Sequence, residues 1–77
     1  MSRLERHIVQ QGLSDDGNRS ITLLRSYRNF QTWYDIEIDR WINGQVEVYV
    51  KNCLDCDQAF DFFDKYIERH NLKVRKG

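Results

Sequence analysis

Two cysteines, Cys53 and Cys56, form the one recognisable chemical motif of this 77-residue chain. A Cys-x-x-Cys pair can cycle between dithiol and disulfide, or it can supply two of the four ligands of a zinc ion. The second cysteine begins a predicted helix, and a helix N-terminus favours the thiolate. Asp55, between the cysteines, acts in the opposite direction because its carboxylate repels a thiolate. A thiol-redox or metal-linked switch at Cys53 and Cys56 is therefore an alternative function.

A zinc site within one chain lacks ligands. The only histidines are His7 and His70. His70 lies roughly 21 Å along the predicted helix from Cys56, at about 1.5 Å per residue, so the two cannot share a metal ion. We expect no metal ion and no cofactor in a single chain. Two chains that each donate a cysteine pair are the remaining route to zinc.

The segment from Val48 to Cys56 resembles the opening strand and active site of glutaredoxins. In that family a helix follows the cysteine pair, and a hairpin with a cis-proline then faces the cysteines. This chain contains no proline. The resemblance implies a thiol-redox site, whereas the missing proline favours a simpler interpretation, in which Cys56 is buried at the start of an apolar helix stripe with Cys53 beside it.

No other catalytic motif is present. The sequence contains no Gly-x-Ser-x-Gly, no glycine-rich phosphate loop and no His-Glu-x-x-His. Its carboxylates fall on predicted solvated faces, which are unfavourable for general acid–base catalysis. We therefore expect no enzymatic activity. The chain also lacks the run of roughly twenty apolar residues that a membrane span needs and the apolar stretch of a signal peptide, so we expect a cytoplasmic domain without membrane contact.

Charge is unevenly distributed, although twelve basic and twelve acidic residues balance. The net charge is +2 over residues 1–34, −6 over residues 35–68 and +4 over residues 69–77. The body is acidic, and residues 70–77 form a basic tail. Because nucleic-acid binding usually needs a clustered basic face, we expect weak or no binding of nucleic acid. The alternative is a small nucleic-acid-associated regulator that uses this tail with the N-terminal arginines Arg3, Arg6, Arg19, Arg25 and Arg28.

Alternation of period two predicts half-buried antiparallel strands in the centre of the chain. The apolar positions are Tyr34, Ile36 and Ile38 in one segment and Val46, Val48 and Val50 in the next. A further strand, with Ile21 and Leu23, runs to about Arg28. A tight turn at Asn29–Phe30 sets Ile21 against Ile38 and Leu23 against Ile36. A three-residue turn over Ile42–Gly44, with Gly44 left-handed, pairs Ile38 with Val48 and Ile36 with Val50, which keeps every valine on the apolar face.

Residues 56–69 form an amphipathic helix that covers the apolar face. Asp55 and Gln58 fit a capping box, and Asn71 is a plausible helix end. The stripe that faces the sheet consists of Cys56, Ala59, Phe60, Phe63 and Ile67. The predicted fold is α+β, a three-stranded antiparallel meander with one C-terminal helix packed on one face.

Residues 1–19 allow two interpretations. Ser2 with Glu5 makes a second capping box, and Gly12 followed by Leu13 suits a helix end, so we favour a short N-terminal helix. Residues 15–18 also make a good hairpin turn, in which case residues 6–13 are a fourth strand. The tail from Leu72 either adds a short edge strand or frays. Residues 1–77 form a single domain in every case.

The sheet face opposite the helix provides the leading functional hypothesis. Large aromatic and acidic side chains are expected to share it, namely Trp33, Asp35, Glu37, Asp39, Trp41, Glu47 and Tyr49. Aromatic side chains ringed by acids predict a surface that binds a protein with a basic surface. Two other interpretations remain open: the N-terminal segment covers this face and buries Leu24 and Trp33, or the face pairs with a second copy in a homodimer.

We therefore predict a non-enzymatic module that binds a partner protein stoichiometrically. Carboxylates would steer the encounter, and desolvated aromatic side chains would hold the complex. In size, fold type and charge layout the chain is similar to compact acidic proteins that phages and mobile elements use against host defence enzymes, including the anti-CRISPR proteins. By analogy alone, this similarity implies an inhibitor of host defence.

Overall fold

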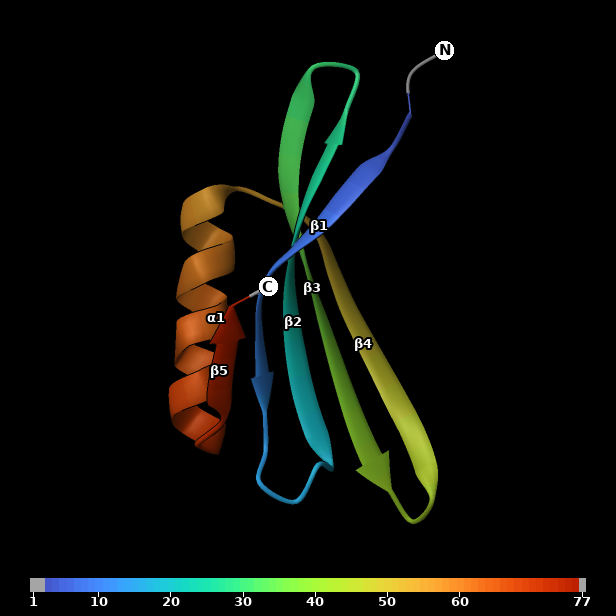
Figure 1. Cartoon of the computed structure of the whole chain (residues 1–77), viewed down its shortest axis with the longest axis vertical. Coiled ribbons are helices and arrows are strands. Elements are labelled where there is room, and N and C mark those ends of the chain that lie inside the picture. Colours follow the sequence, from blue (N-terminus) through green and yellow to red (C-terminus); the bar gives the residue numbers. More distant parts are fainter. Residues whose placement is uncertain (1–2, 77) are drawn as a thin grey trace.

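Five antiparallel strands and one helix make up the fold in the computed structural model, which describes residues 3–76 (Figure 1). The strand order in the sheet is β4-β3-β2-β1-β5, so the first four strands form a meander, and α1 returns across the sheet before β5 pairs with β1. The predicted α+β meander with a C-terminal helix is confirmed, with more strands than expected. The elements are β1 (Glu5–Leu13), β2 (Arg19–Arg28), β3 (Gln31–Ile42), β4 (Gln45–Leu54), α1 (Cys56–His70) and β5 (Lys73–Lys76).

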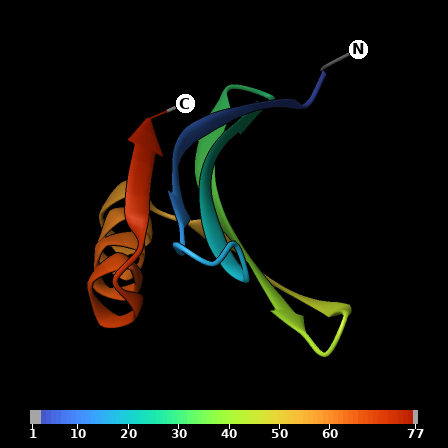
Figure 2. The same ribbon diagram turned by 60° about the horizontal axis from the view of Figure 1, so that its bottom comes forward.

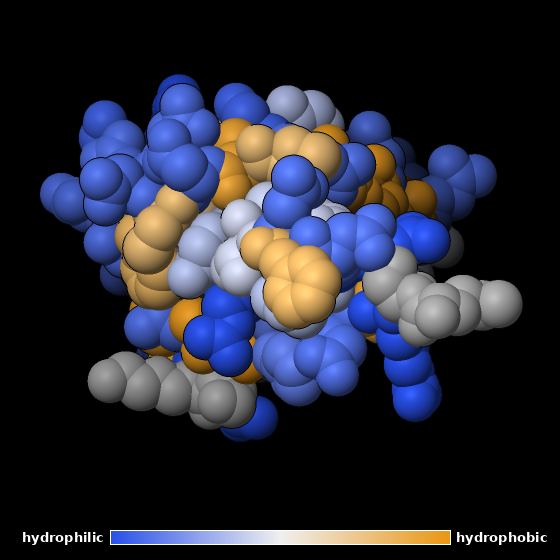
Figure 3. Space-filling model, turned by 90° about the horizontal axis from the view of Figure 1, so that it is seen from above, coloured by the Kyte–Doolittle hydropathy of each residue, from blue (hydrophilic) through white to orange (hydrophobic). Residues whose placement is uncertain are grey.

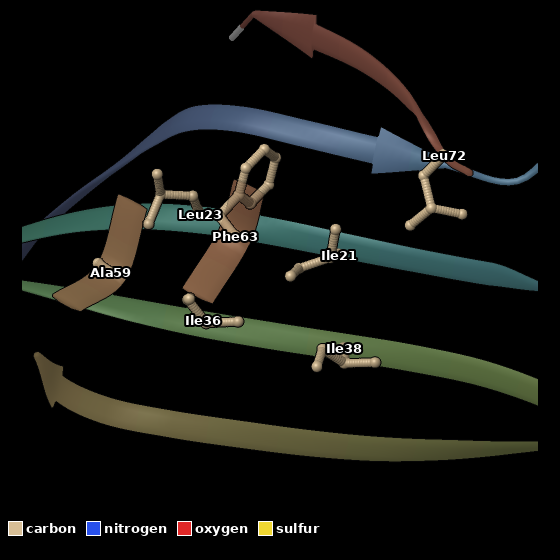
Figure 4. Close-up of a cluster of buried hydrophobic side chains, with 7 residues drawn as sticks. All are labelled: Ile21, Leu23, Ile36, Ile38, Ala59, Phe63 and Leu72. Carbon is tan, nitrogen blue, oxygen red and sulfur yellow. The ribbon is translucent and has the colours of Figure 1, made fainter. Parts of the chain in front are cut away.

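The hydrophobic core lies between α1 and the two middle strands β2 and β3 (Figure 4). Ile21 lies opposite Ile38 and Leu23 opposite Ile36, as predicted. Alternate residues of a strand point to the same side of the sheet, so all four isoleucine and leucine side chains meet the helix. The helix contributes Ala59 and Phe63, and Leu72 closes the core beside β5.

The turn between β2 and β3 is the predicted two-residue turn at Asn29–Phe30. Both residues are left-handed, with φ of 53° and 61°, the geometry of a type I′ hairpin turn. Phe30 is 95% exposed at the tip. Figure 3 looks down on this end of the molecule and shows apolar side chains at the surface among hydrophilic ones.

The turn between β3 and β4 differs from the prediction. Asn43 and Gly44, with φ of 52° and 79°, form a two-residue turn that sets Ile42 opposite Gln45, so the predicted three-residue turn is wrong. Ile38 consequently lies opposite Tyr49 rather than Val48. A shift of one residue moves every side chain of a strand to the other face, and the three valines of β4 therefore point away from the helix.

The reason for this difference is the width of the helix. One helix packs against β2 and β3, while most of β4 lies at the edge of the sheet and only its last residues, Lys51 and Leu54, reach α1. Turning Val46, Val48 and Val50 toward the helix side would therefore bury little apolar surface. The Asn-Gly dipeptide, which favours a type I′ turn, then decides the register.

The N-terminal segment is a strand, not the predicted helix. Residues Glu5–Leu13 form β1, which pairs with β2 on one side and β5 on the other. The register shifts between Ile8 and Gln10, so Val9 occupies a β-bulge and packs against the core. The alternative turn at residues 15–18 is the observed one. There the backbone N–H of Asn18 and, to a smaller extent, the hydroxyl of Ser14 donate to the Asp16 carboxylate and lower the pKa of Asp16.

The helix begins and ends as predicted. The Asp55 carboxylate accepts a 2.7 Å hydrogen bond from the backbone N–H of Gln58, and the Gln58 side chain returns the bond to complete the capping box. Asn71 ends the helix in the left-handed conformation, with φ of 53°. One detail of the predicted apolar stripe is wrong, because Cys56 is exposed in the first turn rather than buried. The C-terminal tail forms the edge strand β5.

Candidate functional site

The face of the sheet opposite α1 is uncovered in the described part of the chain (Figure 2). We call it the outer face. Its exposed apolar side chains come from three strands and are Ile8, Trp41, Val46, Val48 and Val50. Leu24 and Trp33 lie half-buried on the same face. The alternative in which the N-terminal segment covers this face does not hold for residues 5–13, because they lie beside β2 within the sheet and not across it.

The predicted partner-binding residues divide between the two faces. Trp33, Asp35, Glu37, Asp39 and Trp41 alternate along β3 and point to the outer face. Glu47 and Tyr49 of β4 point to the helix side, opposite Arg40 and Ile38. The two-residue turn explains this separation, since it exchanges the faces of all β4 side chains. The valines of β4 replace Tyr49 and Glu47 on the outer face.

Asp35 has a structural position on this face. Its side chain is only 2% exposed. One carboxylate oxygen accepts a 2.7 Å hydrogen bond from the Ser26 hydroxyl, and the other accepts a 3.0 Å bond from the backbone N–H of Cys53. The guanidinium of Arg6 lies 3.7 Å away. Asp35 is thus held within the protein and is not free to contact a partner.

The other two carboxylates of the outer face, Glu37 and Asp39, are only partly accessible. Glu37 and Asp39 are both half-buried, and they lie opposite Val50 and Val48 of β4. The Oδ1 atom of Asp39 is buried and has no hydrogen-bond partner among residues 3–76. Buried carboxylate oxygens are normally paired, so this atom is an unsatisfied acceptor within the outer face. The outer face therefore combines an apolar surface with negative charge.

A second feature, which the sequence did not reveal, is a groove between α1 and β4 on the helix side. A hollow of about 600 Å³ is lined by residues that include Lys51, Phe62, Tyr66 and Arg69. A neighbouring hollow of about 380 Å³ shares Tyr66 and includes Tyr49. The rings of Phe62 and Tyr66 are stacked, with centroids 6.3 Å apart. We call these two hollows the helix groove.

Cations surround the aromatic rings of the helix groove. Arg19 donates a 2.8 Å hydrogen bond to the Tyr66 hydroxyl, and the Lys51 ammonium lies 5.2 Å from the centre of the Phe62 ring. The ring centroid of His70 is 4.4 Å from that of Tyr66. Burial and the positive charges of Arg19, Arg69 and Arg40 lower the pKa of His70. The groove also contains Asp61, which pairs with Lys65 at 3.0 Å, and Glu47, but its lysines and arginines outnumber these acids. It is therefore aromatic and net basic, opposite in charge to the outer face.

No family model matches the chain, and neither a curated protein nor a solved structure matches it.

The N-terminal arginines do not form one patch. Arg6 lies beside Asp35 on the outer face, whereas Arg19 is in the helix groove. Arg25 points to the helix side of the sheet and lies opposite His7, near the start of β1. The grouping that the structure does create joins Arg19 with Arg40 of β3, Lys51 of β4 and the helix cations. No local sequence pattern signals it, because its members come from four separate elements.

The cysteine pair lies at the junction of β4 and α1. Cys53 and Cys56 are both free and exposed, and Cys53 is left-handed, with φ of 60°, at the irregularity that ends β4. Burial and, secondarily, a hydrogen bond with Cys56 raise the pKa of Tyr34. Among residues 3–76, no three His, Cys, Asp or Glu side chains gather where they could hold a metal ion. No helix in that range is both long and apolar enough to cross a membrane.

Proposed function

We propose that this chain is a small non-enzymatic module that binds one partner protein through its outer face. The observation that carries the proposal is the row of exposed apolar side chains on β3 and β4 with no element over it. Trp41 is 53% exposed and Val48 is 58% exposed, although both lie within regular strands. Contiguous apolar surface of this kind is typical of interaction sites, and tryptophan is enriched among the residues that dominate binding energy.

The charge of the outer face defines the partner. Glu37 and Asp39 lie opposite Val50 and Val48 of β4, and both side chains are half-buried. A partner that presents arginine or lysine around an apolar centre would pair with these two carboxylates and bury the valines. Complementary charge would mainly accelerate the encounter, and the apolar centre would slow dissociation.

The experiment is affinity capture from nuclease-treated lysate with matched variants. Trp41→Ala removes an exposed ring from the outer face, and Tyr27→Ala removes an exposed ring from the helix side of β2. We expect one stoichiometric partner on the wild type and on Tyr27→Ala, and its loss on Trp41→Ala. Circular dichroism checks that both variants fold. Equal retention on both variants, or equal loss, would exclude the outer face as the binding site.

A narrower form of the proposal concerns the partner's own ligand. By analogy with acidic inhibitors of phages and mobile elements, the partner would be a host defence enzyme with a basic nucleic-acid-binding surface. Such an inhibitor competes with nucleic acid for the purified partner. We expect added oligonucleotide to release the partner from the captured protein, and Asp39→Lys to abolish the competition. Simultaneous binding of oligonucleotide and this chain would contradict inhibition by occupation.

The helix groove favours a second candidate function, the binding of single-stranded nucleic acid. Stacked aromatic rings beside cations are the usual elements of such sites, where bases stack and phosphates meet basic side chains. Lys65 and Arg69 line the groove from the helix. Fluorescence anisotropy with a labelled single strand tests this function. Affinity that falls with salt and is lost in Lys65→Glu/Arg69→Glu, but is kept in Lys73→Glu/Arg75→Glu on β5, would support the groove.

A further inference from the structure

We infer that two copies of this chain pair through the free edge of β4, in antiparallel orientation and in one defined register. β4 is the outermost strand of the sheet, and every residue from Gln45 to Cys53 is exposed. It contains no proline, no glycine and a valine at every second position from Val46 to Val50. A long edge strand of this composition is a template for pairing unless it is blocked.

The opposite edge of the sheet is less suited to pairing. It consists of β5 and of the first half of β1, which β5 does not reach and which ends in the bulge at Val9. β5 has only four residues, and three of them, Lys73, Arg75 and Lys76, are basic. Two copies of β5 would repel each other, since like charges would come together along the pair. β4 has one acid and one base instead, Glu47 and Lys51. The two edges of the sheet therefore differ in length and in charge, and β4 is the better suited to self-association.

Backbone geometry determines which groups of β4 face the free edge. Ile42 and Gln45 flank the two-residue turn, so they exchange backbone hydrogen bonds, and each second residue of β4 after Gln45 does the same with β3. Val46, Val48 and Val50 therefore direct their backbone N–H and C=O groups outward. A second strand must pair with these groups, which requires a valine opposite a valine in the centre of the contact.

Only a few registers of a two-fold symmetric pair meet this condition. The axis can pass through Glu47, Val48, Tyr49 or Val50. An axis through Glu47 sets this carboxylate against its own copy, which is unfavourable. With an axis through Val48 or Val50, Glu47 of one copy does not lie opposite Lys51 of the other, so the two charges do not pair. An axis through Tyr49 sets Glu47 of each copy opposite Lys51 of the other, twice by symmetry.

An axis through Tyr49 also brings together side chains that lie on the same face of the sheet. Glu47, Tyr49 and Lys51 all point to the helix side, opposite Arg40, Ile38 and Ile36. In the pair they occupy non-hydrogen-bonded positions, where Cα atoms are only about 4.5 Å apart and side chains are closest. Neither Glu47 nor Lys51 forms an ion pair with another described side chain. The only charge interaction of Lys51 among the described residues is with the ring of Phe62, over which its ammonium lies. On the outer face, Val48 of each copy meets Val50 of the other.

The ladder has a natural end. The register of β4 against β3 shifts beyond Lys51, and Cys53 is left-handed there. A bulge re-aims the strand and terminates pairing. Contact between two copies is therefore confined to about one strand length from Gln45, and the pair closes on itself as a dimer instead of extending into a fibre, because each copy has one such edge. The pairing would place two outer faces side by side in one continuous sheet.

Charge reversal tests the register. Glu47→Lys and Lys51→Glu each bring like charges together twice, so each is expected to raise the dimer dissociation constant at least about tenfold in sedimentation equilibrium. An equimolar mixture of the two variants, and the double variant Glu47→Lys/Lys51→Glu, should both recover the wild-type association. These substitutions lie on the helix side and leave the outer face intact, so their result is independent of the partner proposed above.

Three results would overturn the inference. One is a wild-type chain that stays monomeric up to about 1 mM. Another is association that neither single variant weakens. The third is a failure of the mixture and the double variant to recover, with circular dichroism showing folded protein. The last would assign any dimer to another register or surface.

A cross-link provides a second measurement of the register. In a Cys53→Ser/Cys56→Ser background, Tyr49→Cys places one thiol of each copy at the symmetry axis, within the Cα separation that a disulfide accepts. Mild oxidation should give a covalent dimer. Val48→Cys is the matched control, because its counterpart across the axis is Val50 and not itself. Equal cross-linking of both variants, or of the control alone, would contradict the Tyr49 axis.

Discussion

The hydroxyl of Ser26 donates a 2.7 Å hydrogen bond to the carboxylate of Asp35, and both side chains are buried on the outer face. The second carboxylate oxygen accepts from the backbone N–H of Cys53 at the irregular end of β4. Arg6 of β1 approaches to 3.7 Å. One carboxylate therefore connects β1, β2, β3 and β4. It also holds the left-handed Cys53 in place, and so sets where the pairing edge of β4 ends.

Loss of this carboxylate is expected to destabilise the fold. Asp35→Ala should lower the free energy of unfolding by about 3 kcal/mol, because it leaves the Ser26 hydroxyl and the Cys53 N–H without their acceptor. The Arg6 contact adds little, since that guanidinium is largely exposed. Urea denaturation measures the change. Glu37→Ala, a half-buried neighbour on the same strand, should cost about 0.5 kcal/mol or less. Equal losses for both variants would contradict the bridging role of Asp35.

A close approach between Gly12 and Ile67 explains a glycine within β1. A Cβ atom at position 12 would overlap the Cδ1 methyl of Ile67 and lie 3.0 Å from Ile21. Gly12→Ala should therefore cost about 1–3 kcal/mol, as overpacking does in other cores. Ile67→Val removes the overlapping methyl. In the double variant the Gly12→Ala cost should be smaller than in the single one, which a double-mutant cycle measures. Strictly additive losses would show that the contact is not the cause.

The parts of the fold that the sequence predicted are those with strong local signals. Alternation fixed the pairing of Ile21 with Ile38, and the capping residues marked both ends of the helix. β1 was predicted only as the alternative to an N-terminal helix, because the bulge at Val9 interrupts its alternation. The faces of β4 were mispredicted for a different reason. Its alternating valines are typical of core positions, although no element of the fold packs on them.

The candidate sites were predictable to different extents. The outer face was expected from the aromatic and acidic residues of β3, and five of the seven predicted residues do point to it. The helix groove was not expected, because Arg19, Arg40, Lys51 and Tyr66 come together only after α1 crosses the sheet. The buried position of Asp35 was also unpredictable, since it depends on a bulge in β4 that presents the Cys53 N–H.

The left-handed conformation of Phe30 predicts a stabilising substitution. A side chain in this region costs roughly 1–2 kcal/mol, and glycine avoids most of that cost. Phe30→Gly creates an Asn-Gly type I′ turn, and the 95% exposed ring makes no packing contribution that would be lost. The free energy of unfolding should rise by about 0.5–1 kcal/mol. Phe30→Ala keeps the strained conformation and should change stability little; a similar gain from alanine would assign the effect to the ring.

The lowered pKa of His70 predicts a pH dependence of stability. Burial is the main cause, and Arg19 of β2, Arg40 of β3 and Arg69 of α1 add repulsion. The unfolded chain, where the ordinary value is 6.5, then binds a proton more readily than the folded chain. Stability is fully present above this value and falls as the pH drops through the folded pKa. Thermal unfolding from pH 8 to pH 5 should show this loss in the wild type, and His70→Gln should lose less over the same range, because the carboxylates titrate alike in both proteins. Parallel profiles would mean that the histidine stays as accessible to protons in the fold as in the unfolded chain, and the groove would then be wetter than its aromatic lining indicates.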